Sequence, residues 1–339
     1  MRIAELVSNY HSVPPQKAGA IYQVVERITN GLLAKGHEVT LFASGDSITQ
    51  ARLESVTNIR TSNMDLSNNT IQHYMHLLAS KCYEKANEFD IIHSHFTLIS
   101  AFYNRLVKTP SVQTLHSSIT DDVRSLLAEF KDLNYISFSH SQRRQMPELN
   151  WIANVYHGID MEEFQFNDQP GDYLLFMGRI VEEKGPHLAI EVARELGEQI
   201  IIAGSSYADD SYWHDQIEPQ IDGKQVQYIG EASNVDKIDY FRNAKALLFP
   251  IQWEEPFGLV MIEAMACGTP VIALNRGSAK EIIRDGETGF VVEDLKGLIE
   301  ATQAVNKINR RACRDRVERL FSLEKMVDGY ERVFKRIIE

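Results

Sequence analysis

Apolar runs alternate with amphipathic segments from the beginning of the chain. Residues 2–7 form a short apolar run, a segment rich in loop-forming residues follows, and residues 21–36 then show the apolar spacing of a helix. Residues 37–43 are a second β-branched and apolar run. This order of strand, loop, helix and strand predicts a βαβ unit and therefore a parallel sheet.

The same alternation continues through the rest of the chain. Residues 71–89 have the spacing of an amphipathic helix, and the predicted strands at 90–96 and 111–118 follow it. In the second half, residues 172–197 form a strand, a loop and a helix, and the buried-strand pattern returns at 269–274. The pattern predicts an α/β protein built from doubly wound sheets.

The length of the chain favours two domains. Single hydrophobic cores rarely grow beyond about 300 residues, and this chain has 339. The acidic segment 161–172, which contains Pro170 and Gly171, is the predicted interdomain linker. We therefore predict domains at 1–163 and 164–321 and a terminal helix at 322–339.

Candidate chemistry is most concentrated in residues 253–273. Pro256 and Gly258 end the preceding segment and good helix formers follow, so a helix is predicted to begin near Gly258. Its unsatisfied N–H groups and its dipole would make a site for a phosphate. Glu255 precedes the predicted helix and Glu263 lies about two turns into it. A solvated helix with ordinary surface glutamates is the alternative interpretation.

A second candidate site follows the predicted strand that Gly178 ends. The loop after this glycine carries Arg179 and Lys184. Both could be surface partners of Glu182 and Glu183, and such ion pairs contribute only about 0–1 kcal/mol. Arginine can also fork onto phosphate oxygens while lysine acts as a point charge, so the two cations equally suit a diphosphate.

Three histidines lie at predicted strand ends, where open α/β sheets bind ligands. His93 and His95 are interpreted as packed, hydrogen-bonded residues, and His116 follows the next strand. No third ligand at a telling spacing accompanies His93 and His95, so we predict no metal site.

Composition and charge exclude several other classes of protein. The chain is 44% hydrophobic and 24% charged, as in an ordinary globular protein, and its formal net charge of −12 disfavours nucleic-acid binding. Three cysteines without metal or disulfide spacing suggest reduced thiols in a cytoplasmic protein. No apolar run approaches the ~18 residues of a membrane span. Acids interspersed in the basic C-terminal segment favour a solvated face over peripheral membrane contact.

Several motifs resemble a known enzyme family. The two glutamates that flank PFGLVMI, followed by AMACGTPVIA, resemble the signature of the retaining nucleotide-sugar glycosyltransferases of family 4. G-R-x-x-x-x-K-G, from Gly178 to Gly185, resembles the motif whose Arg and Lys hold the donor diphosphate. T-L-H-S-S, around His116, resembles the segment whose histidine lies beside the sugar. The chain also lacks the Asp-x-Asp that holds a divalent ion in the other large glycosyltransferase fold.

The loop before the first predicted helix departs from the family pattern. That loop usually carries Gly-Gly against the donor phosphates, whereas here it is Lys17-Ala18-Gly19-Ala20. Gly19 is therefore either a donor contact or a turn glycine.

The resemblance implies the GT-B fold, in which two doubly wound Rossmann-like domains face each other across a cleft. The domain at 1–163 would bind the acceptor, that at 164–321 would bind the nucleotide-sugar donor, and the helix at 322–339 would cross back to the first domain. The implied catalytic residues are Glu255, His116, Arg179 and Lys184. The implied donor-binding residues are Gly19, Gly178, Arg179, Lys184, Gly204, Tyr228, Ile229, Glu255, Pro256, Phe257, Gly258, Leu259 and Glu263.

Residue roles follow from the same resemblance. Arg179 and Lys184 would neutralise the departing phosphate, Glu255 would position the sugar, Glu263 would hold the ribose, and His116 would close over the sugar. These features predict a metal-independent, retaining hexosyltransferase that needs no cofactor, with a UDP-sugar such as UDP-glucose as donor and an unidentified acceptor.

Two alternatives stay open at this point. One is a catalytically silent nucleotide-sugar binding protein, and the other is a sugar-nucleotide epimerase or a phosphorylase of related architecture. Donor hydrolysis or transfer excludes the first alternative, and product analysis excludes the second.

Overall fold

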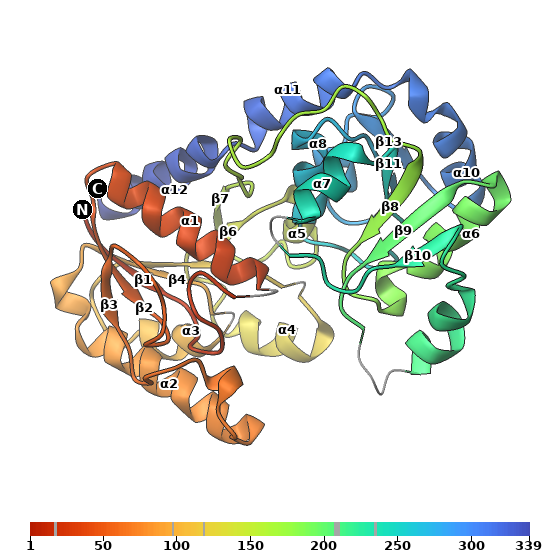
Figure 1. The fold of residues 1–339 in the computed structure, drawn as a ribbon. Coiled ribbons are helices and arrows are strands. Elements are labelled where there is room, and N and C mark those ends of the chain that lie inside the picture. Colours follow the sequence, from red (N-terminus) through yellow and green to blue (C-terminus); the bar gives the residue numbers. More distant parts are fainter. Residues whose placement is uncertain (17–18, 97, 118, 207–210, 234–235) are drawn as a thin grey trace. The chain divides into compact units, whose positions relative to one another are not determined.

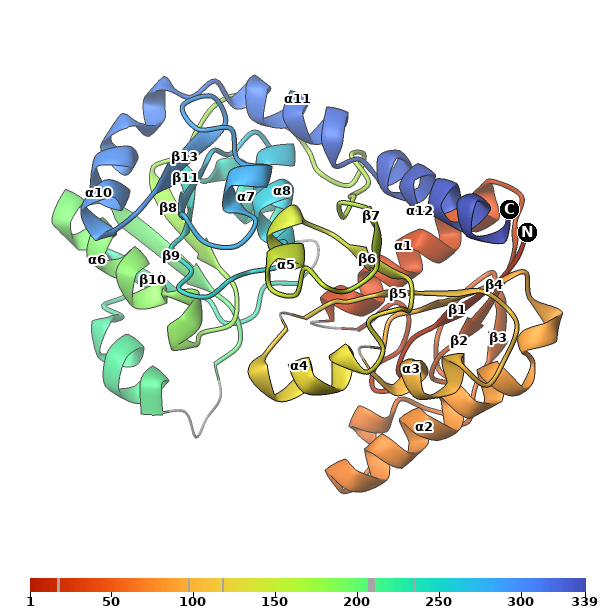
Figure 2. The ribbon, with the colours of Figure 1, turned by 180° about the vertical axis from the view of Figure 1, so that it is seen from behind.

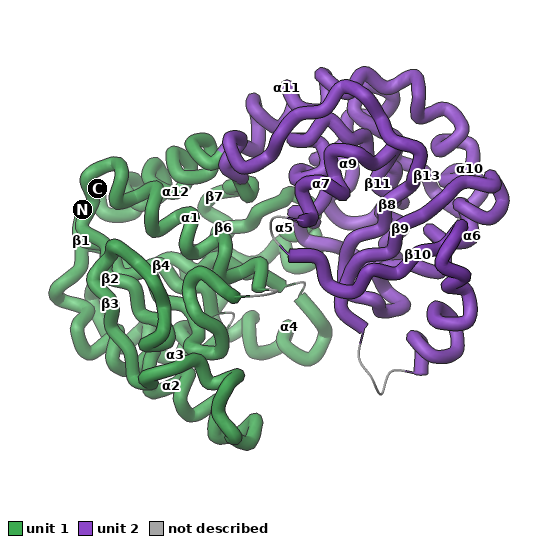
Figure 3. The backbone as a smooth tube through the Cα atoms, viewed as in Figure 1, with its two compact units in different colours: residues 1–158, 323–339 green, residues 159–322 purple. Residues whose placement is uncertain are grey.

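The computed structural model describes residues 1–16, 19–96, 98–117, 119–206, 211–233 and 236–339 (Figure 1). The chain divides into two compact units (Figure 3). Unit 1 contains Met1–Gly158 and Leu323–Glu339, and unit 2 contains Ile159–Ser322. Each unit is built around one parallel sheet, which confirms the predicted α/β fold class.

Unit 1 contains a parallel sheet in the order β3-β2-β1-β4-β5-β6-β7. Its strands are β1 (Arg2–Leu6), β2 (Glu38–Phe42), β3 (Arg52–Glu54), β4 (Ile91–Ser94), β5 (Ser111–Thr114), β6 (Tyr135–Ser137) and β7 (Trp151–Asn154). Its helices are α1 (Ala20–Ala34), α2 (Asn68–Glu84), α3 (Ile99–Asn104), α4 (Asp121–Ala128), α5 (His140–Arg144) and α12 (Leu323–Ile338).

The two faces of the first sheet are covered by different helices. α2 and α3 lie on one side of the sheet, and α1 and α12 lie on the other (Figures 1 and 2). Side chains alternate between the two faces of a strand. Ala4 and Leu6 of β1 accordingly pack with Leu78 of α2, whereas Glu5, between them, points to the opposite face.

Unit 2 contains a parallel sheet in the order β10-β9-β8-β11-β12-β13. Its strands are β8 (Tyr173–Met177), β9 (Gln199–Ala203), β10 (Val226–Tyr228), β11 (Ala246–Phe249), β12 (Val271–Leu274) and β13 (Gly289–Val292). Its helices are α6 (Pro186–Leu196), α7 (Asp236–Asn243), α8 (Leu259–Ala266), α9 (Ala279–Ile282), α10 (Leu295–Ala304) and α11 (Arg310–Leu320). α6 and α10 pack on one face of the sheet, and every residue of β12 is buried, as its apolar run predicts.

The predicted linker at 161–172 is instead part of unit 2. Phe164 is only 2% exposed, and the backbone N–H of Asn167 donates to the carbonyl of Cys267 at 3.0 Å. The Asn167 side-chain amide also donates to the carbonyl of Arg242 at 3.1 Å. These contacts attach the segment to the second core, so the chain passes from unit 1 to unit 2 between Gly158 and Ile159.

The C-terminal helix α12 belongs to unit 1, where it packs along α1 (Figure 1). Tyr330 and Phe334 on its inner face are fully buried, and Lys35 contacts Glu331 at 3.0 Å. None of the helices in the described part of the chain combines the length and the apolar character needed to cross a bilayer.

Gly31 allows the close packing of α12 on α1. A Cβ atom at this position would lie 3.0 Å or less from both γ-carbons of Val327. Alanine normally stabilises a helix by about 1 kcal/mol relative to glycine, but overpacking costs about 1–3 kcal/mol. We therefore expect Gly31→Ala to lower the free energy of unfolding, measured by urea titration.

The Val327→Ala variant supplies the matched background for this test. With the valine methyl groups removed, Gly31→Ala should become neutral or stabilising, because only the helix propensity remains. A stabilising effect of Gly31→Ala in the wild-type background would show that the two helices do not pack through this contact.

Candidate functional site

The candidate residues of unit 2 surround the point where the strand order of the sheet reverses. The chain builds β8, β9 and β10 towards one edge and then returns to place β11 on the other side of β8. Loops that leave neighbouring strands in opposite directions at such a point leave room for a ligand. Here they are the loop from Gly178 to Gly185, after β8, and the loop from Pro250 to Gly258, after β11.

Hydrogen bonds to backbone carbonyls connect these two loops. The Gln252 N–H donates to the Glu183 carbonyl at 2.8 Å, and the Gln252 side-chain amide donates to the Glu182 carbonyl at 3.0 Å. Gly185 has a φ of 72° and lies so close to Pro250 that a Cβ would be 3.1 Å from its carbonyl carbon. The sequence element Lys184-Gly185 is therefore held beside the second loop.

Lys184 and Glu255 form an ion pair across the two loops. Lys184 Nζ contacts Glu255 Oε2, and the indole N–H of Trp253 donates to the same oxygen at 3.0 Å. Lys184 Nζ also lies 4.8 Å from the centre of the Trp253 ring, a cation–π contact. The Lys184 and Glu255 side chains are 16% and 14% exposed. A lysine and a carboxylate are thus brought together from opposite sides of the strand reversal.

Helix α8 begins immediately after this ion pair. Gly258, with a φ of 81°, precedes the first helical residue Leu259 and, having no side chain, provides no side-chain cap. Pro256 and Phe257 are buried beneath the turn. The predicted helix start is confirmed, but Glu263 is the fifth residue of α8 and so lies just over one turn, not two, into the helix.

Glu263 is buried and has a lysine partner. Its side chain is 4% exposed, and its Oε1 contacts Lys237 Nζ at 2.8 Å. Lys237 comes from α7, and its own side chain is 15% exposed. Glu263 is therefore not the solvated surface glutamate of the alternative interpretation.

Four other candidate residues meet at the carboxyl ends of β8, β9 and β10. The Gly178 N–H donates to the Ala203 carbonyl at 3.0 Å, and a Cβ on Gly204 would overlap the Gly178 carbonyl. The hydroxyl of Tyr228 donates to the Gly204 carbonyl at 2.9 Å, and the Ile229 N–H continues the strand pairing to Ile202. Glycine is required at 204 for this close approach.

Arg179 has a different environment from Lys184. Its guanidinium contacts Glu183 at 3.0 Å, and both side chains are nearly half exposed. This is the surface ion pair that the sequence offered as one interpretation of both cations. Arg179 thus forms the surface ion pair, whereas Lys184 pairs with Glu255, whose side chain is largely shielded from solvent.

Gly19 and His116 belong to unit 1. Gly19 precedes α1 and packs on Pro15, whose Cβ would lie 2.8 Å from a Cβ at position 19. Lys17 and Ala18, which complete the departing family motif, lie outside the described residues. His116 follows β5, and its Nε2 lies 2.8 Å from Nδ1 of His95.

Buried histidines and one glutamate gather around His116. Glu5, His93 and His95 are completely or almost completely buried, and their ligand-type atoms lie within 4.8 Å of one another. A third ligand-type residue therefore lies beside the two histidines, although no telling spacing in the sequence marked it. Glu5 is 88 residues from His93 in the sequence, but parallel pairing of β1 with β4 places them side by side.

Burial controls the ionisation of this cluster. His157 also belongs to this cluster, because its ring stacks 5.9 Å from that of His116. Burial lowers the pKa of His93 to about 3, of His95 to about 4 and of His157 to about 3, and it lowers the pKa of His116 well below its ordinary value. Burial also raises the pKa of Glu5, an effect that hydrogen bonding and charge interaction with His95 oppose. The four histidines are therefore neutral at pH 7.

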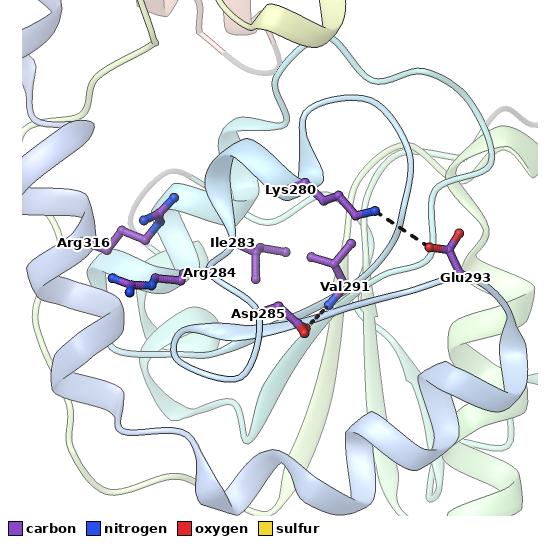
Figure 4. A pocket seen from close by; sticks show the side chains of 7 residues that line it. All are labelled: Lys280, Ile283, Arg284, Asp285, Val291, Glu293 and Arg316. Carbon is purple, nitrogen blue, oxygen red and sulfur yellow. Dashed lines mark hydrogen bonds and ion pairs between the residues drawn. The ribbon is translucent and has the colours of Figure 1, made fainter.

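A separate surface pocket of about 700 Å³ lies elsewhere in unit 2 (Figure 4). Lys280 faces Glu293 across it, with 3.9 Å between the charged atoms. It is lined by Lys280, Ile283, Arg284, Asp285, Val291, Glu293 and Arg316. None of the candidate donor-binding residues is among these seven, so the pocket does not support the predicted site.

Comparison with known families agrees with the geometry of both units. Residues 22–161 match the family model described as Glycosyltransferase Family 4, and residues 160–311 match that described as Glycosyl transferases group 1. The chain belongs to the family 4-type glycosyltransferases.

Relatives of this glycosyltransferase extend over nearly its whole length. A putative glycosyltransferase of Bacillus subtilis, YtcC, is 23% identical over 100% of this chain and 93% of its own. Sucrose-phosphate synthase from Thermosynechococcus elongatus has a TM-score of 0.80 at 20% identity, covering 99% of this chain and 98% of its own. HepE of Anabaena in complex with UDP and glucose has a TM-score of 0.77 at 16% identity, covering 99% and 100%. These structural likenesses confirm the GT-B fold.

The sequence interpretation missed several partners in this glycosyltransferase. Trp253 and Lys237 were given no role, although they contact Glu255 and Glu263. Neither had a signal in the sequence, since an aromatic residue in a loop and a lysine on a helix are ordinary. Glu5 did have one, because a charged residue inside the apolar run 2–7 must have a buried partner if the strand is covered on both faces.

The buried histidines predict that the glycosyltransferase loses stability in mild acid. Their pKa values are lower in the folded than in the unfolded chain, so below about pH 6.5 the unfolded chain binds more protons. At pH 5.5 each of His93, His95 and His157 should cost about 1.4 kcal/mol, partly offset by Glu5, whose raised pKa acts oppositely. We expect a net loss of roughly 2–4 kcal/mol between pH 7.5 and 5.5 in urea titrations.

A histidine variant tests whether the loss of stability in acid comes from this cluster. His157→Phe should reduce the loss between pH 7.5 and 5.5 by about 1.4 kcal/mol, because one proton fewer is bound on unfolding. A free energy of unfolding that does not change over this pH range would show that the histidines are not held neutral.

Proposed function

We propose that the protein is a retaining, metal-independent hexosyltransferase that uses a nucleoside-diphosphate sugar, a UDP-hexose such as UDP-glucose. Unit 2 would bind the donor, and unit 1 would bind the acceptor. The presence of UDP and glucose in the structure of HepE supports this choice of donor. The motifs of residues 178–185 and 255–263, which the family assigns to donor binding, support the choice of unit.

The observation that carries the proposal is the contact between Lys184 and Glu255 beside the start of α8. It joins one charged residue from each of the two loops at the strand reversal, next to a helix N-terminus whose cap residue, Gly258, has no side chain. A lysine and a helix N-terminus together favour a dianionic leaving group. Glu255, already oriented by Trp253, supplies an acceptor for sugar hydroxyls.

The proposed reaction breaks the bond between the anomeric carbon and the diphosphate oxygen. The bonding electrons leave with the nucleoside diphosphate, and the acceptor oxygen bonds to the anomeric carbon on the same face as its proton passes to the departing phosphate. Negative charge therefore grows on the diphosphate as the bond breaks, and Lys184 and Arg179 would oppose it. Glu263 would hold the ribose, and His116 of unit 1 would contact the sugar.

Lys184→Met tests the phosphate site while keeping most of the side-chain volume. The lost charge would act more strongly on the transition state than on the bound donor, so kcat should fall while donor KM changes less. Removing one preorganised electrostatic contact typically costs about 10²- to 10³-fold. We would measure kcat and KM for donor hydrolysis or transfer, together with the melting temperature.

Two other lysines serve as controls for this variant. Lys237 is as shielded as Lys184 and also pairs with a glutamate, so Lys237→Met should instead raise donor KM by freeing Glu263. Lys224 is exposed, and Lys224→Ala should behave like the wild type. A folded Lys184→Met enzyme with normal kcat would refute the assignment of the phosphate site.

The stereochemistry and the metal requirement can be tested in one experiment. We expect transfer from UDP-glucose to a simple alcohol such as glycerol to continue in EDTA, because Lys184 and the start of α8 supply the positive charge. The first-formed glycoside should be α-linked, as in the donor, and NMR of its anomeric proton identifies it. A β-linked product would exclude retention, and activity restored only by Mg²⁺ or Mn²⁺ would exclude metal independence.

The same experiment separates the proposed enzyme from its alternatives. A catalytically silent binding protein would shift its melting temperature with UDP-glucose without releasing UDP. An epimerase or a phosphorylase would yield a different sugar nucleotide or a sugar phosphate in place of the glycoside.

A further inference from the structure

Five polar side chains share one face of the first sheet at its own strand reversal. β1 and β4 are neighbours there although helices and strands separate them in the sequence, and Glu5 pairs in register with His93. Alternate residues of a strand share a face, so His95 lies on the same side as His93. β5 adds Thr114, and His116 follows two residues later.

These side chains form a continuous hydrogen-bonded chain. Glu5 Oε2 lies 2.9 Å from His95 Nε2, and His95 Nδ1 lies 2.8 Å from His116 Nε2. A branch leads from Glu5 Oε2 to His93 Nδ1 at 2.9 Å, and from His93 Nε2 to the Thr114 hydroxyl at 2.8 Å. The His95 arm leads to His116, and the His93 arm leads to Thr114.

Helix α12 shields this chain from solvent. The rings of Tyr330 and Phe334 lie 5.0 Å and 5.2 Å from the ring of His93. Glu5, His93 and His95 are 0%, 0% and 5% exposed. Because water is excluded from such a site, each buried N–H or O–H donor must pair with an acceptor among these hydrogen-bonded side chains.

A neutral imidazole has one nitrogen that donates through its N–H and one that accepts through its lone pair. The tautomer of one ring therefore determines the tautomer of the next ring. When the Glu5 carboxylate accepts from His95 Nε2–H, His95 Nδ1 carries a lone pair. It can then only accept, and His116 must donate from Nε2. The lone pair of His116 is consequently on Nδ1.

We propose that Glu5 and His95 are positioning residues that hold His116 in the Nε2–H tautomer, so that its Nδ1 accepts a hydrogen bond from a hydroxyl of the transferred sugar. The sugar contact rests on the proposed function, whereas the tautomer follows from unit 1 alone. His116 thereby recognises a hydroxyl as a neutral acceptor and is not a general acid.

The ligand-free wild-type protein provides the first test. Long-range ¹H–¹⁵N NMR spectra of protein labelled with ¹⁵N-histidine distinguish the two tautomers, and a His116→Gln variant assigns the His116 signals. At pH 7.5 we expect His95 and His116 both as Nε2–H. Finding His116 as Nδ1–H or as an imidazolium would overturn the proposal, and so would stoichiometric zinc in the purified protein, since the metal would replace the N–H donors.

Variants of Glu5 and Thr114 test the origin of the tautomer. Glu5→Leu removes the acceptor, so His116 should become a mixture of tautomers. Glu5→Gln should keep the wild-type spectrum, because its amide oxygen can still accept from both rings. Thr114→Val disturbs only the His93 branch and should leave His116 unchanged. A folded Glu5→Leu protein with His116 still entirely Nε2–H would refute the relay.

Addition of UDP-glucose then tests the sugar contact. The His116 Nδ1 signal should shift on titration, and Glu5→Leu should lower kcat/KM for hydrolysis roughly tenfold, the usual value of one hydrogen bond. Glu5→Gln should restore the rate. If the tautomers are as expected but the donor leaves the His116 signals unmoved, the relay stands and the sugar contact is excluded.

Discussion

The ion pair of Lys184 with Glu255 constrains the whole arrangement of the second unit's site. Both side chains are removed from most of the solvent, and an isolated charge in such a place costs several kcal/mol unless it has a partner. Each side chain therefore supplies the oppositely charged partner that the other needs, and both depend on the backbone contacts that hold their loops together. Trp253 strengthens the arrangement by donating to the carboxylate and shielding the ammonium group.

This constraint also indicates how a donor would be received. In the proposed reaction an entering diphosphate would offer Lys184 a more strongly charged partner than Glu255, and Glu255 would then turn to the sugar hydroxyls. The buried contact between Lys237 and Glu263 repeats the same arrangement one turn into α8. Both glutamates are thus held in place before a ligand binds, which reduces the reorganisation that binding would otherwise require.

Unit 1 also buries ionisable side chains, but those around His116 are mostly neutral imidazoles. One carboxylate and a series of imidazoles occupy the face between the sheet and α12, where burial keeps the rings uncharged. The sheet supplies the positions, because parallel pairing aligns β1, β4 and β5, and α12 supplies the shielding. The packing of α12 against Gly31 therefore contributes to the environment of His93 as well as to stability.

Much of the protein could be predicted from the sequence because the signals were local. The apolar periodicity identified the alternating strands and helices, and Pro256 and Gly258 marked the beginning of α8. The motifs at 178–185 and 255–263 were identifiable through their resemblance to family 4, and their glycines also marked local turns and a helix start.

Only the tertiary structure decided which charged groups meet. Lys184 has acidic neighbours in its own loop, yet it contacts Glu255 of the other loop. Arg179 pairs instead with Glu183 of its own loop. Glu5 contacts His93 and His95 because the strand order places residues far apart in the sequence side by side. Segment 161–172 packs on the second core because its buried residues and backbone hydrogen bonds attach it there. Spacing along the chain specifies turns and helix faces, whereas partners across a parallel sheet depend on which strands become neighbours, and that is settled only when the whole sheet folds.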